Sequence, residues 1–186
     1  HSTTIGAIEE AQKKYVEPAQ IKAGYTVLDF CFGLGYNSLA ALHQEPRLTI
    51  IGLEDDPEII DRINHIQVPA KYQETYRKLQ HAASELEYQD KETIITLHVG
   101  DARQTIKGLT ERFDAVLFDP FAPSTCPELW TKEIFIEIFK RMQPGALLTT
   151  YSCARMVRNN LFAAGFKVRD GPCVGRRAPA TIAMRP

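Results

Sequence analysis

The sequence predicts an α/β fold built on a doubly wound, mostly parallel sheet. Short apolar runs of strand length alternate along the 186 residues with segments of helical period. Two of the apolar runs, 26–30 and 48–53, lead into turns with acidic residues or glycines, as parallel strands do beside a bound nucleotide. The last two apolar runs are joined without a helix, so we expect the final strand to return antiparallel.

Residues 5–16 carry apolar side chains at helical spacing, and Pro18 interrupts the pattern, so we expect an N-terminal helix that ends before the proline. This helix belongs to a helical segment over 1–22, and the sheet core follows over 23–186. With 44% hydrophobic and 24% charged residues, the chain has the composition of a single globular domain with a full core.

The sheet core is expected to begin with the apolar strand at 26–30, followed across a glycine turn by a helix at 37–43. The second apolar strand, at 48–53, precedes a helix at 57–64 that has proline at its favoured first position. Residues 71–87 combine a helical period with many polar side chains, which predicts a longer and partly exposed helix.

The alternation continues in the second half of the chain. A strand of alternating polarity is expected at 93–98 and a short helix at 102–109. The strand at 114–118 is almost wholly apolar, which predicts burial on both faces. A helix at 132–142 ends at the Gln-Pro-Gly that follows it, and a fifth strand is expected at 146–151.

The chain is expected to finish with one helix and two short strands. Gly165 closes the helix over 154–164. The strands at 166–169 and 181–184 are separated by a connection rich in Gly, Pro and Arg.

Composition excludes several classes of protein. No apolar run is long enough to span a membrane and no secretory signal is present, so we expect a cytoplasmic protein with no membrane partner. The four cysteines lie far apart with no C-x-x-C pair, so we expect no metal site. Reduced cytosolic thiols are one interpretation of these cysteines, and a disulfide in the cytosol of a thermophile is the other. The chain starts at His1, which indicates a fragment or a trimmed N-terminus.

The net charge of −1 conceals an uneven distribution of charge. Residues 1–139 hold 13 Lys and Arg against 22 Asp and Glu, whereas residues 140–186 hold 9 Lys and Arg against one acid, Asp170. Such a basic C-terminal end suggests a polyanionic partner, and a solvated basic surface without a partner is the alternative.

The turn after the first strand predicts a cofactor site. Gly33 and Gly35 would let a ligand approach the backbone closely. A dinucleotide site would carry a third glycine to hold a pyrophosphate, and Ser38 stands at that position instead. S-adenosylmethionine (AdoMet) has no pyrophosphate but has a sulfonium cation, and Asp29 is placed to order the turn and to neutralise that positive end. These features indicate a Rossmann-like, class I AdoMet-dependent methyltransferase.

Two further acids follow neighbouring strands. Glu54 would accept hydrogen bonds from both ribose hydroxyls, and Asp101 is placed to contact the adenine amino group. Because the carboxyl ends of parallel strands meet at one edge of a sheet, these acids and Asp29 would surround a single ligand. We expect the cofactor to be bound by Asp29, Cys31, Gly33, Gly35, Asn37, Glu54, Asp55, Gly100, Asp101, Ala102 and Asp119.

The strand at 114–118 ends in Asp119, Pro120 and Phe121, to which we assign the catalytic role. Asp119 would lie beside the transferred methyl group, and Pro120 would leave its carbonyl free to accept a hydrogen bond. A carboxylate beside a carbonyl suits an amine nucleophile, which has a pKa of about 10 and arrives protonated. The aromatic residues that could stack on a nucleobase, or else pack in the core, are Tyr36, Phe121 and Trp130.

Residues 119–130, DPFAPSTCPELW, resemble the D-x-F-A-P-x-x-N-P-x-x-W block in the methyltransferase domain of the MnmC family, the tRNA 5-methylaminomethyl-2-thiouridine biosynthesis proteins. Residues 31–37 are similar to its C/G-F-G-x-G-x-N turn, and residues 53–57 to its V/L-E-x-x-P segment. The resemblance implies methyl transfer from AdoMet to the aminomethyl nitrogen of a modified wobble uridine in tRNA (nm5U-type to mnm5U-type). It also implies a stand-alone form without the FAD-dependent oxidase domain of the fused enzyme.

A tRNA substrate agrees with the basic C-terminal end of the chain. We expect this end to bind phosphates of the anticodon stem-loop, with an affinity that falls as salt rises. Bases of a single-stranded loop are accessible and can turn toward a pocket. The residues expected to bind tRNA are Trp130, Arg155, Arg158, Lys167, Arg169, Arg176 and Arg177.

Three other functions remain open at this point. A small-molecule amine methyltransferase or aminopropyltransferase would use several acids for a polyamine, and only Asp119 and Glu128 are available for that purpose. A catalytically inactive RNA-binding module would have no use for Asp29, Glu54 and Asp119. An NAD-dependent oxidoreductase would need the third glycine and a His or Tyr arrangement for hydride transfer.

Overall fold

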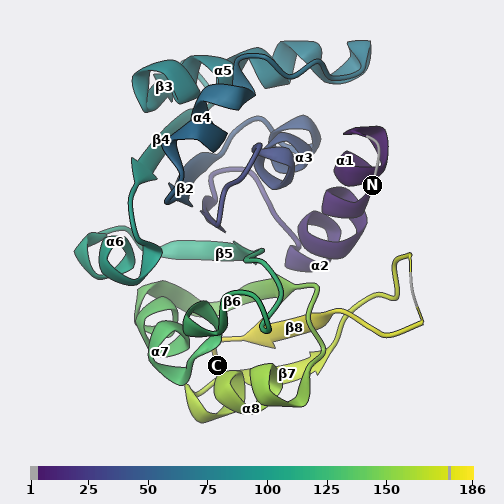
Figure 1. Ribbon diagram of the computed structural model, residues 1–186, viewed down its shortest axis with the longest axis vertical. Coiled ribbons are helices and arrows are strands. Elements are labelled where there is room, and N and C mark those ends of the chain that lie inside the picture. The colour runs from purple at the N-terminus through teal and green to yellow at the C-terminus, as the bar shows by residue number, and fades with distance from the viewer. Residues whose placement is uncertain (1–3, 176) are drawn as a thin grey trace.

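The computed structural model describes residues 4–175 and 177–186. One eight-stranded sheet runs through the molecule in the order β3-β4-β2-β1-β5-β6-β8-β7. Figure 1 shows this sheet extending from β3 near the top to β7 near the bottom. The strands are β1 (Thr26–Phe30), β2 (Thr49–Glu54), β3 (Glu87–Gln89), β4 (Ile94–Val99), β5 (Phe113–Phe118), β6 (Met142–Thr150), β7 (Lys167–Asp170) and β8 (Thr181–Met184).

Five central strands are parallel and the strands at both ends are not. β1 pairs in parallel with β2 and β5, β2 with β4, and β5 with β6. β8 lies antiparallel between β6 and β7, and β3 lies antiparallel on β4. The predicted doubly wound, mostly parallel sheet with an antiparallel last strand is therefore confirmed.

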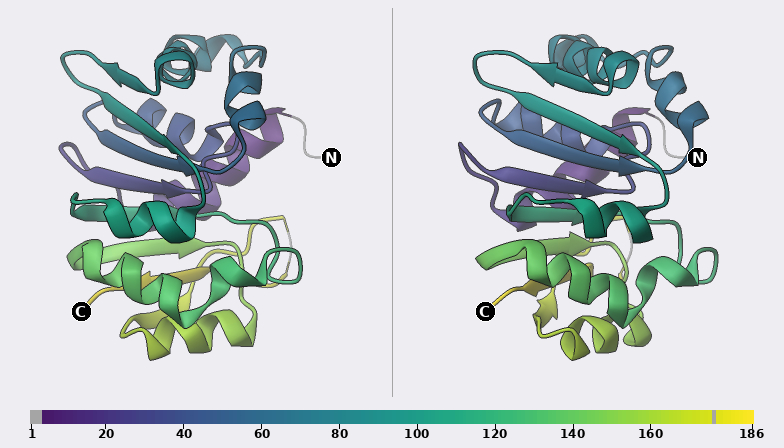
Figure 2. Two further views of the ribbon diagram at one scale, coloured as in Figure 1. Left: turned by 60° about the vertical axis from the view of Figure 1, so that its left-hand side comes forward. Right: turned by 90° about the vertical axis from the view of Figure 1, so that its left-hand side faces the viewer.

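Helices cover both faces of the sheet. The helices are α1 (Thr4–Ala11), α2 (Glu17–Ala19), α3 (Tyr36–Gln44), α4 (Pro57–Ile63), α5 (Gln73–Glu85), α6 (Ala102–Gly108), α7 (Lys132–Arg141) and α8 (Arg155–Ala163), with a π-helical turn η1 (Gln12–Val16) and 3-10 turns η2 (Ala70–Tyr72) and η3 (Pro127–Trp130). One apolar cluster joins α1, η1, α3, α4 and α5 to the sheet, and a second joins α6, α7 and α8 to the opposite face. In the right-hand view of Figure 2, α6 and α7 lie in front of the strands and the N-terminal helices lie behind them.

The predicted end of the N-terminal helix is wrong. The helical path continues through η1 into α2, with Pro18 in the first turn of α2. In the π-helical turn, the backbone N–H of Glu17 donates to the carbonyl of Gln12, five residues earlier. This wider turn restarts the hydrogen-bond pattern, so the proline stands where a missing N–H costs little.

The predicted helix over 71–87 is too long, and the strand β3 was not predicted. The helix ends at Glu85 because Leu86 adopts a left-handed conformation, with φ of +61°. β3 has three residues, two of them exposed and charged or polar, and it is held by pairing with β4 rather than by burial. A strand this short and polar has no alternating apolar pattern from which it could be predicted.

Within the described residues, no helix combines the length and the apolar character needed to cross a bilayer. All four cysteines are present as free thiols.

The fold brings the carboxyl ends of four parallel strands to one edge. Phe30 at the end of β1 pairs with Leu53 of β2 and with Phe118 of β5, and Glu54 pairs with Val99 of β4. The residues that follow each strand therefore meet above this edge, which is where an α/β sheet binds its ligands.

Candidate active site

The turn after β1 is held in a conformation that requires glycine. Gly33 and Gly35 have φ of +56° and +74°. A Cβ atom on Gly35 would lie 3.0 Å from the ring of Phe32, so this position is also closed by contact. Cys31 has φ of +66°, an unusual conformation for a residue with a side chain. The predicted cofactor turn is therefore sharply bent, and the backbone N–H groups of Phe32 and Gly35 donate to carbonyls of Leu53 and Phe32.

The buried carboxylate of Asp29 fixes the conformation of this turn. Its side chain is fully buried, and Oδ2 accepts hydrogen bonds from the backbone N–H of Ser38 at 3.1 Å and from the Ser38 hydroxyl at 2.6 Å. Its Oδ1 is buried without a hydrogen-bond partner in the described part of the chain. Burial raises the pKa of Asp29 to about 8, although the bonds from Ser38 act in the opposite direction. Asp29 thus fastens the start of α3, and the expected direct contact with a ligand cation is not available to a side chain with no exposed surface.

The Glu54 carboxylate connects the same turn to the end of β2 by hydrogen bonds. Its Oε2 accepts from the N–H of Gly33 at 2.8 Å, and its Oε1 accepts from the N–H groups of Asp55 and Asp56 at 3.0 and 3.1 Å. Burial raises the pKa of Glu54, and the bonds from Gly33 and Asp56 oppose that shift. Three of about four acceptor positions of the carboxylate are in use, so ribose hydroxyls would share this carboxylate with the backbone.

A cavity of about 140 Å³ opens beside Glu54. It is lined by Cys31, Leu53, Glu54, Asp55, Asp101, Ala102, Arg103, Glu128 and Leu129. Five of these residues were predicted to bind the cofactor from sequence, and the fold brings them together from three strand ends. Leu53, Arg103, Glu128 and Leu129 were not predicted to do so, because nothing local distinguishes them from ordinary surface or core residues.

Asp101 has a structural partner in this cavity. Its carboxylate accepts from the backbone N–H of Arg103 at 2.9 Å and forms an ion pair with the Arg103 side chain at 2.7 Å. The Arg103 guanidinium lowers the pKa of Asp101. A contact between Asp101 and an adenine amino group therefore requires the Arg103 side chain to give up part of this pairing.

Asp119 lies at the end of β5, directly beside the end of β1. Its backbone N–H donates to the carbonyl of Phe30 at 3.1 Å. Its Oδ1 accepts from the hydroxyl of Tyr15, and its Oδ2 accepts from the side-chain amide of Asn37 at 3.2 Å. Burial raises the pKa of Asp119 to about 6, while the hydrogen bonds from Tyr15 and Asn37 favour the ionised form. The carboxylate is thus held in one orientation and is ionised at neutral pH.

Tyr15 is a site residue that the sequence did not reveal. The π-helical turn directs its hydroxyl to Asp119, and the Thr149 hydroxyl of β6 donates to the Tyr15 carbonyl at 3.1 Å. Burial, and next the charge of Asp119, hold the pKa of Tyr15 well above its ordinary value, so the phenol stays protonated and donates. In the sequence, Tyr15 falls within the apolar helical pattern of residues 5–16, which predicts a core position and no contact with Asp119.

The loop that follows Asp119 is held in place by a hydrogen bond from the indole of Trp130. Trp130 Nε1 donates to the carbonyl of Phe121 at 2.9 Å, and the Trp130 ring packs edge-on against Phe118 and Tyr151. Trp130 has no exposed surface, so the prediction that it binds tRNA by stacking on a base is wrong. Phe121, by contrast, is 80% exposed and free to meet a base. The Pro120 carbonyl accepts a hydrogen bond from the Tyr151 hydroxyl at 3.1 Å.

A second cavity, of about 440 Å³, lies between the N-terminal helices and the β7–β8 connection. It is lined by Gly6, Glu9, Glu10, Lys13, Lys14, Tyr151, Val174 and Gly175. The charges of Glu10 and Lys14 act on Asp119, and the charge of Asp119 acts on Cys31 in the first cavity. Asp119 lines neither cavity but is close to residues in the walls of both.

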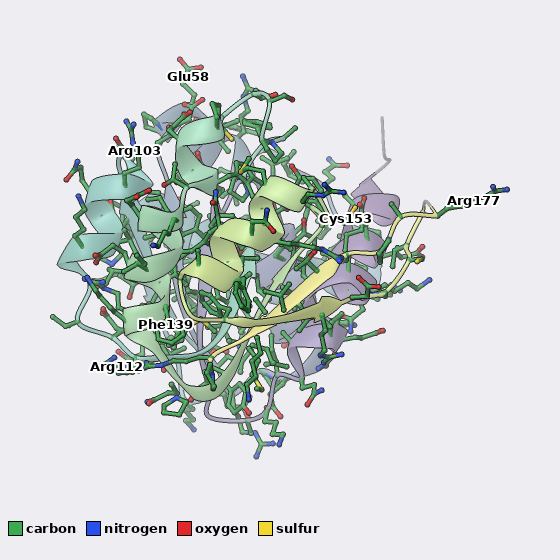
Figure 3. All side chains as sticks on the ribbon, turned by 90° about the horizontal axis from the view of Figure 1, so that it is seen from below. Glu58, Arg103, Arg112, Phe139, Cys153 and Arg177 are labelled. Atoms are coloured by element: carbon green, nitrogen blue, oxygen red, sulfur yellow. The ribbon has the colours of Figure 1, made fainter. Side chains whose placement is uncertain are left out.

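The basic C-terminal residues divide into two kinds. Arg155, Lys167, Arg169 and Arg177 are exposed, and Figure 3 shows Arg177 pointing away from the body of the molecule at the outer end of the connection between β7 and β8. The predicted tRNA-binding residue Arg176 lies outside the described residues.

Arg158 differs from these, which corrects its predicted role. It forms an ion pair with Asp170 at 2.7 Å and donates to the Thr181 hydroxyl and the Ala180 carbonyl. Its guanidinium braces α8 against the last two strands and is not available for a phosphate.

Comparison with known proteins gives a consistent family. Residues 65–186 match the model of a family described as S-adenosyl-L-methionine-dependent methyltransferase. An uncharacterized protein of Methanocaldococcus jannaschii is 33% identical over 97% of this chain and 52% of its own length. The bifunctional MnmC protein of Ralstonia nicotianae, named for tRNA 5-methylaminomethyl-2-thiouridine biosynthesis, is 31% identical over 90% of this chain and 28% of its own length.

Solved structures agree with these sequence matches. The crystal structure of MnmC2 from Aquifex aeolicus superposes with a TM-score of 0.84 at 31% identity, covering 99% of this chain and 63% of that one. The spermidine synthase of Thermotoga maritima, with a TM-score of 0.61 at 12% identity, shares the fold. The chain spans about half the length of the archaeal relative and less than a third of the bifunctional protein. The resemblance to the methyltransferase domain of MnmC is confirmed.

Proposed function

We propose, from the premise that this chain belongs to the S-adenosyl-L-methionine-dependent methyltransferase family, that it methylates a primary amine on tRNA. The acceptor is the aminomethyl nitrogen of a modified wobble uridine, converted from an nm5U-type to an mnm5U-type nucleoside. One observation carries this proposal: a carboxylate held by two hydrogen bonds lies close to wall residues of two cavities, within the block of residues that resembles the MnmC methyltransferase domain.

The residues around the smaller cavity fit AdoMet. The bent turn contributes Cys31 to the wall of this cavity, and Glu54 can share its carboxylate with ribose hydroxyls. Buried Asp29 holds the start of α3 next to this turn through its hydrogen bonds from Ser38. AdoMet, when bound, supplies a methyl carbon made electrophilic by the sulfonium, and its carbon–sulfur bond breaks as the nitrogen–carbon bond forms.

Asp119 would bind and orient the amine. An alkylamine has a pKa of about 10, so it enters as an ammonium ion and must release one proton to water before it can react. With a pKa of about 6, Asp119 is too weak a base to hold that proton, but its charge attracts the ammonium and then aligns the neutral amine. Tyr15 and Asn37 occupy one position on each carboxylate oxygen and leave the others for the substrate.

Asp119 would also stabilise the product. The methylated nitrogen is again a cation, and a fixed carboxylate in a site of low dielectric favours the charge that develops there. Tyr15 cannot accept the proton because its phenol is held in the protonated, donating state. The proton therefore leaves through solvent rather than through the side chains that hold Asp119.

The exposed basic residues support a tRNA acceptor. Arg155, Lys167, Arg169 and Arg177 lie on the last helix, the last strands and their connection, where they can contact phosphates of an anticodon stem-loop. Phe121 is exposed beside Asp119 and can stack on an unpaired base. A cytoplasmic location follows from such a substrate.

A direct test uses tRNA from a strain that makes the aminomethyl nucleoside but cannot methylate it. Methyl-labelled AdoMet and the purified protein should place label in one nucleoside, at the amine. Asp119→Asn should retain AdoMet binding and lose at least 100-fold in turnover. Unlabelled tRNA, or label on a ribose or a ring carbon, would contradict the proposal. Free putrescine and spermidine in the same assay separate a polyamine substrate from tRNA.

A further inference from the structure

We propose that the cavity of about 440 Å³ between the N-terminal helices and the β7–β8 connection is the acceptor pocket, and that it takes one amine-bearing nucleotide turned out of its strand. This inference rests on the proposed function and adds the place where the substrate is bound. It also gives the N-terminal helices a part in substrate recognition, although they precede the region that matches the family.

The sheet order puts this cavity on the acceptor side of Asp119. The cofactor cavity lies over the ends of β4, β2 and β1, through Asp101, Glu54 and Cys31. Asp119 follows β5, the next strand in the sheet, and Tyr151 follows β6, the strand after that. Methyl transfer requires the nucleophile and the departing sulfur on opposite sides of the carbon, so the acceptor must arrive from the β6 side.

Two contacts connect the larger cavity to the reacting groups. Tyr151 lines the cavity and its hydroxyl donates to the carbonyl of Pro120, next to Asp119. Lys14 lines the cavity one residue before Tyr15, whose hydroxyl donates to Asp119. A group seated in the cavity is therefore within one side chain of the proposed catalytic carboxylate.

The walls have the size and charge for a nucleotide that carries an amine. About 440 Å³ lies within the range of small-molecule sites, roughly 300–1,000 Å³. The N-terminal wall presents Glu9 and Glu10 together with Lys13 and Lys14, and Lys14 is buried in an ion pair with Glu10. An ammonium beside a phosphate matches walls of both signs.

The outer wall is part of the basic connection. Val174 and Gly175 line the cavity, and Arg177 follows two residues later at the exposed end. Backbone hydrogen bonds between Gly171 and Ala180, and between Ala180 and Pro172, close the base of this connection. The same segment can thus contact phosphates outside and enclose one nucleotide inside, which connects tRNA binding to delivery of the target.

The test fills the cavity without changing charge. Val174→Trp should lower kcat for the hypomodified tRNA at least 30-fold, with AdoMet affinity unchanged and tRNA affinity within fivefold, because outer phosphate contacts remain. Gln89→Trp, on the exposed β3, is the matched control and should behave as wild type. Turnover of Val174→Trp within threefold of wild type, or a loss explained wholly by weaker tRNA binding, would overturn this inference alone.

A second pair of variants tests the charged wall. Lys13→Glu should lower kcat/KM for the tRNA at least tenfold, and Lys22→Glu, the same reversal at an exposed site outside the cavity, should not. If the two charge reversals lowered kcat/KM equally, Lys13 would act only by general electrostatic attraction of tRNA, and that result would count against the pocket. A wild-type protein that leaves the tRNA unlabelled would overturn the proposed function, and this inference with it.

Discussion

Replacing Tyr15 by Phe should raise the pKa of Asp119, because it removes the hydroxyl that donates to Oδ1 of the carboxylate. Hydrogen bonds to charged groups contribute about 1.5–3 kcal/mol, and one pKa unit corresponds to about 1.4 kcal/mol. The loss of this bond is therefore worth about 1–2 pKa units. Starting from a pKa of about 6, Asp119 in the variant should titrate between about 7 and 8.

This shift has a direct consequence at neutral pH. The ionised fraction of Asp119 at pH 7 should fall from about nine-tenths to half or less. The carboxylate that holds the amine is then largely neutral, so methyl transfer by the variant should be weak at pH 7 and recover as the pH rises toward 9. A residue with a purely structural role would lower the rate at all pH values by a similar factor.

The assay is a carbon-13 NMR titration of protein labelled at the aspartate carboxyl carbons, with the Asp119 signal assigned by Asp119→Asn. Tyr76→Phe is the matched control, since the buried hydroxyl of Tyr76 donates to the Leu34 carbonyl and not to Asp119. An Asp119 pKa in Tyr15→Phe that stays within 0.3 of wild type, or moves equally in Tyr76→Phe, would refute the reasoning.

Three further changes test other parts of the site. Glu54→Gln should weaken AdoMet binding about 10–100-fold by calorimetry, because the variant loses a charged acceptor. Glu58→Gln, at an exposed position, is the control and should not weaken binding. Equal AdoMet affinities in the two variants would remove Glu54 from the cofactor site. Trp130→Phe should lower the free energy of unfolding by about 1–3 kcal/mol in urea and leave tRNA affinity within twofold, because the indole is buried; a large loss of tRNA affinity with normal stability would restore its predicted role. The ligand-free protein should lose stability as pH rises from about 4 to about 8, because folding raises the pKa of Asp29 from 3.8 to about 8. In thermal melts, Asp29→Asn should make stability depend less on pH over this range. An equally steep dependence in the variant would contradict this assignment to Asp29.

The grouping of residues around the cavity of about 140 Å³ was predictable because its signals are local. Gly33 and Gly35 have the positive φ that the turn needs, and Glu54 ends a strand that can be read from its apolar run. Parallel pairing then brings these strand ends together without further information. The sequence pattern was sufficient wherever a residue's role depends on its own neighbours in the chain.

The surroundings of Asp119 and of the basic residues were less predictable because their contacts are long-range. Tyr15 reaches Asp119 across 104 positions, through a π-helical turn that has no sequence signature, and the helix was expected to stop before Pro18. Trp130 was predicted to bind tRNA, with packing in the core as the alternative, and the loop folds back so that its indole N–H donates to the Phe121 carbonyl. Arg158 was predicted to bind tRNA as one of several basic residues, and its pairing with Asp170 depends on how α8 packs.

The central claim is that Asp119 holds an amine between a cofactor cavity and an acceptor cavity. Its most direct test is a crystal structure with S-adenosylhomocysteine and an anticodon stem-loop that carries the aminomethyl uridine. We predict the amine nitrogen about 3 Å from the Asp119 carboxylate, with the uridine between Lys14 and Val174. A uridine bound at another face, or a nitrogen with no contact to Asp119, would contradict the account.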